Sequence, residues 1–147
     1  MSRFIFRDDP FLKKLADKLR EAPRQIHDEM ARRMEQKLRE VLRAQFAEAR
    51  DPLGRPYLPP KDGHLPPMRR TGALEDGLTV EAVSTSSGIF LKVTASVEYA
   101  KYLQTGTRRM KARQIVPATG VLAETWRRAI REANQESIEV WYRGTAL

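Results

Sequence analysis

The side chains that could carry acid–base or metal chemistry are few and scattered along the chain. His27 and His64 lie far apart and form no HExxH or similar spacing, whereas a metal site needs three or four converging ligands. The acidic pairs Asp8-Asp9 and Glu75-Asp76 have no nucleophile or oxyanion donor beside them, and a helix cap and a turn explain them better. No phosphate-binding glycine loop and no GxSxG motif occur. We therefore expect no catalytic residue, no metal and no cofactor, and a protein that is not an enzyme.

The densest group of basic side chains is a segment that holds Arg108, Arg109, Lys111 and Arg113 within six residues. Such a run is often a solvated loop. Its functional alternative is contact with DNA phosphates, without sequence readout, or with the acidic surface of a partner protein. The whole chain has 27 Lys and Arg against 19 Asp and Glu, and its net charge of +8 favours polyanionic partners as well as solubility.

Two tyrosines, Tyr99 and Tyr102, precede the basic segment but are not interleaved with its charges. Platforms that bind single-stranded nucleic acid combine aromatic rings with cations along one groove. We therefore expect these two rings in the core or at a subunit interface, where aromatic residues are enriched.

Helical periodicity is strongest over residues 23–49. Apolar residues recur there at every fourth position, namely Ile26, Met30, Met34, Leu38, Leu42 and Phe46. Such a helix would be about 40 Å long, and its apolar stripe must cover something extended, such as a sheet. Upstream, Asp9 suits the N-cap of a short helix that begins at Pro10 and is interrupted at Pro23.

A proline-rich loop and a hairpin follow the long helix. Six of residues 51–68 are proline and two are glycine, a density that excludes helix and strand. Alternating apolar residues over 78–83 and 89–97 predict a β-hairpin with one buried face. One or two helical turns are expected over 99–104. A third helix should begin near Thr119 or Gly120, and alternation over 138–143 predicts a terminal strand.

This order of elements predicts one α+β domain over residues 1–147. A long amphipathic helix should pack on a small antiparallel β-sheet of three to four strands. Residues 1–22 would form an N-terminal helical arm, and residues 50–70 a long Pro-rich loop. The chain has no cysteine, which excludes disulfides and thiolate zinc sites. No stretch approaches the roughly 20 apolar residues of a membrane span, and no signal-peptide pattern occurs, so we expect a protein that stays in the cytosol unless a larger particle carries it out.

Three stretches of the chain resemble the motifs of a known family. They are Asp51-Pro52-Leu53-Gly54-Arg55-Pro56-Tyr57, then Arg70-Thr71-Gly72-Ala73-Leu74, and then Tyr99-Ala100-Lys101-Tyr102-Leu103-Gln104-Thr105-Gly106 followed by Lys111-Ala112-Arg113-Gln114-Ile115-Val116-Pro117. They are similar to the Asp-Pro-x-Gly-x-Pro-Trp, Leu-x-x-Thr-Gly-x-Leu, Tyr-Ala-x-x-x-Gln-x-Gly and Pro-Ala-Arg-x-Phe-x-Pro patterns of phage virion-morphogenesis, or tail-completion, proteins. Related neck and minor tail proteins share parts of these patterns. This sequence has Tyr57, Lys111 and Ile115 where the family has Trp, Pro and Phe.

The resemblance implies a structural virion protein that forms a ring at the head–tail junction of a tailed phage or a phage-tail-like particle. The ring would be a homohexamer, acting as a tail-completion, tail-terminator or neck-connector subunit and joining tail to head. Its partners would be copies of itself, neighbouring tail-tube, neck or portal-connector proteins, and DNA passing through the lumen. It would be assembled in the host cytoplasm and end in the virion.

Two groups of residues follow from this expectation. The predicted subunit interface comprises Pro52, Tyr57, Leu58, Tyr99, Tyr102 and Leu103. The predicted contact with channel DNA or an acidic partner comprises Arg108, Arg109, Lys111 and Arg113. Gly54, Gly72 and Gly106 suit turns that need positive φ.

Two rival interpretations belong to other classes. A basic nucleic-acid-binding module would grip phosphates with the basic faces of its helices, and its monomer would bind DNA in a salt-sensitive way. A small hydrolase would need a converging acid, base and nucleophile around a pocket.

Overall fold

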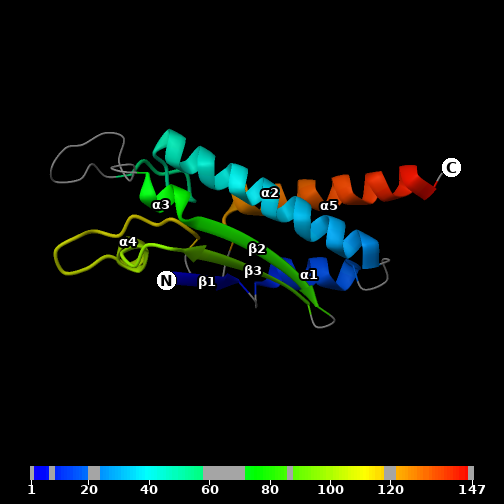
Figure 1. The fold of residues 1–147 in the computed structure, drawn as a ribbon, viewed down its shortest axis with the longest axis horizontal. Coiled ribbons are helices and arrows are strands. Elements are labelled where there is room, and N and C mark those ends of the chain that lie inside the picture. The colour runs from blue at the N-terminus through cyan, green and yellow to red at the C-terminus, as the bar shows by residue number, and fades with distance from the viewer. Residues whose placement is uncertain are drawn as a thin grey trace.

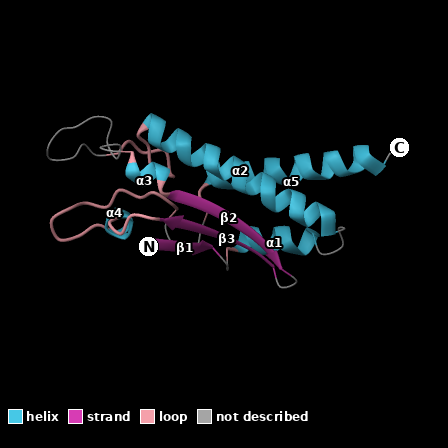
Figure 2. Cartoon of the chain, in the orientation of Figure 1, coloured by secondary structure: helices cyan, strands magenta, loops and turns pink. Residues whose placement is uncertain are grey.

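The structure, a computed structural model, describes residues 2–6, 9–19, 24–57, 72–85, 88–117 and 122–145. Its elements in chain order are β1 (Ser2–Phe6), α1 (Pro10–Leu19), α2 (Arg24–Glu48), α3 (Ala73–Asp76), β2 (Leu78–Thr85), β3 (Gly88–Ala95), α4 (Ala100–Thr105) and α5 (Glu124–Thr145). This is the expected α+β fold, in which the long helix α2 packs on α5 and on a three-stranded antiparallel sheet (Figure 1, Figure 2).

The sheet has the order β1-β3-β2, with β3 antiparallel to both neighbours. Alternate side chains of its strands are buried on one face, as period-two alternation requires. The buried members are Phe6, Val80, Ala82, Ile89, Leu91, Val93 and Ala95. The intervening positions Arg3, Ile5, Thr79 and Glu81 are exposed, so the helices cover one face of the sheet and leave the other open.

The long helix confirms the four-residue periodicity that predicts it. All six stripe residues, from Ile26 to Phe46, are buried, and each such side chain contributes roughly 1.5–3 kcal/mol of burial free energy. Ion pairs join α2 to α5 at the edge of this stripe. Lys37 Nζ lies 2.9 Å from Glu136 Oε1, and Arg33 Nη1 lies 3.2 Å from Glu136 Oε2.

Asp9 confirms its predicted role as the N-cap of α1. Its Oδ1 accepts hydrogen bonds from the backbone N–H of Phe11 at 2.8 Å and of Leu12 at 3.2 Å. Its Oδ2 accepts a third, at 2.9 Å, from the N–H of Leu122 just before α5. One buried carboxylate therefore caps α1 and ties it to the start of α5.

Two expectations at the chain ends were wrong. Residues 2–6 belong to no helical arm, because they form an edge strand whose Phe6 packs against Trp126, with ring centroids 6.0 Å apart. Residues 138–143 form no strand, because α5 continues to Thr145. The buried stripe of α5 has a period near 3.6, and its continuation outweighs the short alternation at 138–143.

Two further predictions meet the edges of the described ranges. The third helix begins at Glu124, a few residues after its predicted start, while residues 118–121 lie outside the described ranges. Of the Pro-rich loop, residues 50–57 are described and 58–71 are not, so His64 and Leu58 also lie outside the described residues. The hairpin and the short helix over 99–104 are confirmed.

Candidate assembly surface

The first motif folds into a tight turn after α2. Ala49 has φ 52°, and Asp51 Oδ1 accepts hydrogen bonds from the N–H of Leu53 at 3.0 Å and of Arg55 at 2.8 Å. Arg55 Nε closes the turn on Asp51 Oδ2 at 2.8 Å. Gly54 has φ 83°, as the sequence predicts, so its left-handed backbone favours glycine. The aspartate and glycine of this motif are there to shape the turn.

The turn delivers Tyr57 into the body of the protein. The Tyr57 N–H donates to Ala49 O at 2.7 Å, and its Oη donates to Gln114 O at 2.7 Å. The side chain is 6% exposed. Burial first, and the nearby Asp51 carboxylate second, raise the pKa of Tyr57 well above its ordinary value, so the phenol stays a neutral donor.

The third motif places Gln104 as a clamp on the segment that follows the basic residues. Its Oε1 accepts from the N–H of Ile115 at 2.8 Å and of Val116 at 3.1 Å, and its Nε2 donates to Val116 O at 2.8 Å. The N–H of Arg113 donates to Leu103 O at 2.6 Å. The amide uses both its donor and its acceptor capacity on one backbone segment, and so closes the loop between α4 and residues 115–116.

A second side-chain amide, that of Gln45, also bonds this segment. Gln45, on α2, is buried; its Nε2 donates to Ile115 O at 3.0 Å, and its Oε1 accepts from Trp126 Nε1 at 2.9 Å. The buried Gln45 amide and the Trp126 indole N–H thereby satisfy one another and the Ile115 carbonyl, and the loop is tied to both helices.

Gly106 shows why this loop needs glycine at its start. Its φ is 77° and its ψ is 172°, a region that is essentially restricted to glycine. A Cβ here would lie 2.9 Å from Ala112 N and 3.0 Å from Met110 O. Across the loop, Thr107 N donates to Met110 O at 2.8 Å. Gly106 therefore lets the chain reverse so that the basic residues form a narrow loop.

The anchored loop displays the predicted basic residues unequally. Arg108, Arg109 and Lys111 are exposed, whereas Arg113 is half-buried. Figure 1 places α4 and the loop after it at one end of the elongated molecule, with the C-terminal end of α5 at the other. The described loop is thus a fixed platform that presents three cations at one end of the fold.

The predicted interface residues fall into two groups. Tyr99 and Tyr102 are 47% and 48% exposed, and Lys101 Nζ lies 5.0 Å from the centre of the Tyr102 ring. Leu103 is half-buried against the core. Pro52 and Tyr57 are buried within their own chain, so they stabilise the subunit's interior rather than its exposed surface.

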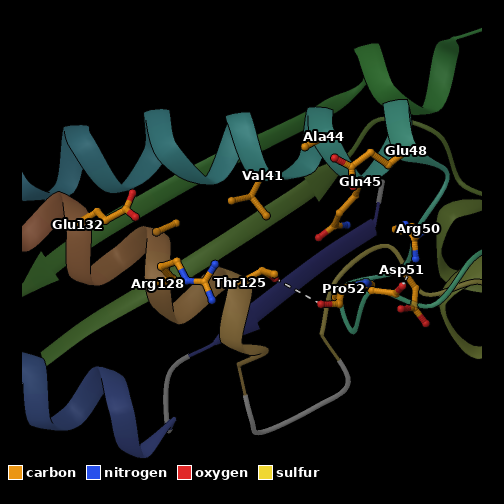
Figure 3. Close-up of a pocket in the computed structure, with 12 residues that line it drawn as sticks. Val41, Ala44, Gln45, Glu48, Arg50, Asp51, Pro52, Thr125, Arg128 and Glu132 are labelled. Atoms are coloured by element: carbon orange, nitrogen blue, oxygen red, sulfur yellow. Dashed lines mark hydrogen bonds between the residues drawn. The ribbon is translucent and has the colours of Figure 1, made fainter.

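A groove that sequence reasoning missed lies between α2, the turn after it and the start of α5 (Figure 3). It has a volume of about 310 Å³ and is lined by residues that include Val41, Ala44, Arg50, Pro52, Arg128 and Glu132. Thr125 Oγ1 donates to Pro52 O at 3.3 Å at one end. No sequence signal marks the groove, because its walls come from segments about 80 residues apart that only the fold brings together.

The described residues also bear on metal binding and on membrane insertion. Within these ranges, no group of three or more His, Asp or Glu side chains could hold a metal ion. None of the described helices is long and apolar enough to cross a lipid bilayer.

The fold and the loop over residues 107–116 define a class of protein. It is an α+β subunit in which the motif residues shape and anchor the loops. The family model described as "Bacteriophage HK97-gp10, putative tail-component" matches residues 11–106, more than half of the chain. Comparison with the curated proteins and with the solved structures gave no match. The chain belongs to this HK97 gp10-like family of phage tail components, a structural family and not an enzyme family. The resemblance to tail-assembly proteins is thereby confirmed.

Proposed function

We propose that this phage tail component works as a ring, a homohexamer at the head–tail junction, where it completes or terminates the tail and joins it to the head. The observation that carries the proposal is the loop over residues 107–116. The Gln104 clamp, the Tyr57 hydroxyl and Gln45 fix its backbone. A preordered loop loses little conformational entropy when it binds, which suits an assembly contact.

Contacts between identical subunits would involve the exposed rings of Tyr99 and Tyr102 and the half-buried Leu103. Exposed aromatic rings supply large contact areas at a small entropy cost, and interfaces are enriched in them. Pro52 and Tyr57 would hold this contact in place from within the subunit. Leu58, next to Tyr57 in the sequence, remains part of the proposed interface.

The basic residues would contact DNA in the central channel or the surface of an adjoining ring. Arg108, Arg109 and Lys111 are exposed on the anchored loop, with Arg113 at its base. Repetition around a ring multiplies this charge, so a closed ring would present a positive rim. Such a rim suits DNA passing through the lumen without sequence readout, or an acidic surface on a tail-tube, neck or portal-connector protein.

The experiment is to image particles made with and without this subunit by negative-stain electron microscopy. For a completion or neck subunit, we expect full-length tails that never join heads. For a terminator, we expect tails of ragged length. Normal, head-joined tails of uniform length in its absence would contradict the proposal.

The nucleic-acid-binding alternative makes a separate prediction for the isolated chain. A free DNA-binding module would bind duplex DNA as a monomer, with an affinity that falls steeply as salt rises. The ring proposal expects weak binding by the monomer, because three exposed cations on one loop neutralise few phosphates. Two results together would favour the alternative: tight, salt-sensitive DNA binding by the isolated monomer, and intact particles when the protein is deleted.

A further inference from the structure

The apolar stripe of α5 continues beyond the part of the helix that the rest of the fold covers. Trp126, Ile130, Ala133 and Ser137 are buried at alternating spacings of four and three residues. The next position on this stripe, Val140, is 46% exposed. A helix normally keeps its apolar stripe against a neighbour, so the stripe ends on a surface that the monomer leaves open.

The cause is the divergence of α5 from α2. The two helices are joined by hydrogen bonding between Trp126 and Gln45 and by ion pairs from Glu136 to Arg33 and Lys37. Beyond these pairs the helices separate, and the C-terminal end of α5 projects past the sheet in Figure 1. Val140 and Arg143 are both exposed on this projecting end.

The groove of Figure 3 lies near the opposite end of α5, beside its first two turns. Val41, Ala44 and Ala129 contribute apolar surface to it. Charged side chains of both signs surround that surface. They are Glu48, Arg50, Asp51, Arg128 and Glu132. Its volume of about 310 Å³ exceeds that of one aliphatic side chain, so it has room for part of a helix surface.

We propose that the projecting end of α5, centred on Val140, docks into this groove on a second copy of the chain. The inference rests on the proposed ring and deepens it by naming the two surfaces that meet. Because the helix end and the groove are two different surfaces, at opposite ends of α5, the contact is head-to-tail, and such contacts either close into a ring by rotation or continue into a filament.

Charge complementarity favours a second copy as the occupant. The projecting end exposes Glu139 and Arg143, one residue of each sign beside Val140. The groove offers Arg128 to the carboxylate and Glu48 to the guanidinium. Arg50 and Glu132 also line it, although Arg50 already donates to Gly54 O and Glu132 already pairs with Lys37. A contact with DNA would instead repel Glu139 and the groove carboxylates, so a nucleic-acid occupant fits this pair of surfaces poorly.

Disulfide cross-linking tests the contact cleanly, because the chain contains no cysteine. One variant carries Val140→Cys and a second carries Ala44→Cys, a substitution at an exposed residue of the groove. Under mild oxidation, the mixed variants should give a covalent dimer that either alone gives at most at background level. A chain with both substitutions should give a ladder that ends at the size of the closed ring. Gln135→Cys, also exposed on α5 but away from the stripe, replaces Val140→Cys as the matched control.

Native mass spectrometry of the wild-type protein separates the two proposals. Wild-type oligomers together with the cross-linked ladder support both the ring and the docking of α5 into the groove. Oligomers without the mixed dimer, or with a dominant Val140→Cys homodimer, overturn the docking and leave the ring standing. A chain that remains a monomer and does not cross-link, alone or in purified tails, contradicts both. Val140→Asp should also weaken oligomer formation by about tenfold or more, while Gln135→Asp should not.

Discussion

Gln104 and Val116 are joined through both ends of one side-chain amide, which accepts from the Val116 N–H at 3.1 Å and donates to the Val116 carbonyl at 2.8 Å. The Ile115 N–H also donates to this amide. The side chain of Gln104 thus bonds the backbone of residues 115–116 much as a neighbouring strand would. It explains why a glutamine stands before Gly106: the amide sets the end of the loop and the glycine sets its start.

Gln104→Ala should therefore release the loop. Three hydrogen bonds would be lost, and backbone groups of Ile115 and Val116 would be left without this partner, at a cost of about 1–3 kcal/mol in unfolding free energy. Hydrogen exchange should accelerate over residues 107–116. Thr105→Ala is the control, because Thr105 is exposed and bonds only within its own turn among the contacts described. Equal exchange in the two variants would contradict the clamp.

Two glycine substitutions with similar φ should differ in their effect. Gly54→Ala meets no atom within 4 Å, so it carries only the strain of a left-handed residue, about 1–2 kcal/mol. Gly106→Ala carries that strain in a region nearly closed to other residues and also overlaps the backbone near Ala112. Urea denaturation should therefore rank Gly106→Ala as the more destabilising. If Gly54→Ala were the more destabilising, the close backbone contacts at Gly106 would be contradicted.

Tyr57 should make stability depend on pH in the alkaline range. Its pKa is raised in the folded protein, chiefly by burial, so the neutral phenol is favoured in the folded state. That contribution is complete below the ordinary tyrosine pKa of 10.0 and is lost as the pH rises above it. Denaturation between pH 9 and 11 should show a steeper fall in unfolding free energy for wild type than for Tyr57→Phe. Parallel curves would contradict a buried, protonated Tyr57.

The exposed cations of the loop should matter for assembly and not for folding. The double variant Arg108→Glu/Arg109→Glu should lower the yield of infective particles by about tenfold or more, since reversed charge repels an anionic partner, while its unfolding free energy changes by less than about 0.5 kcal/mol. Arg39→Glu, at an exposed site on α2, serves as the control. A double variant that joins heads as well as wild type would remove the loop charges from the proposed contact.

Much of the fold could be predicted because its signals are local. The stripe from Ile26 to Phe46 indicates a helix by spacing alone, and Asp9 indicates a cap by its position before Pro10. The strand β1 gave no comparable signal. Its five residues are too short for a clear alternation, and its pairing of Phe4 with Val93 joins residues 89 positions apart in the sequence. Residues 138–143 misled the prediction because they alternate over a length that suits a strand, while they also continue the helical stripe through Ser137 and Val140.

The surface was harder to predict than the fold, because its supports are distant in sequence. Tyr99, Tyr102 and the cations could be identified by type, and their exposure agrees with an assembly role. The partners of Gln45, by contrast, lie 70 and 81 residues away, and a glutamine near an apolar stripe carries no local sign of such a task. The buried hydroxyl bond of Tyr57 could not be predicted either, because its acceptor, Gln114 O, lies 57 residues away.

The most direct test is a cryo-electron microscopy reconstruction of the head–tail junction in intact particles. We predict a closed ring of six copies between head and tail, with the loop over residues 107–116 at a ring surface that meets DNA or the adjoining ring. Copies found singly, spread along the tail, or missing from the mature particle would contradict it.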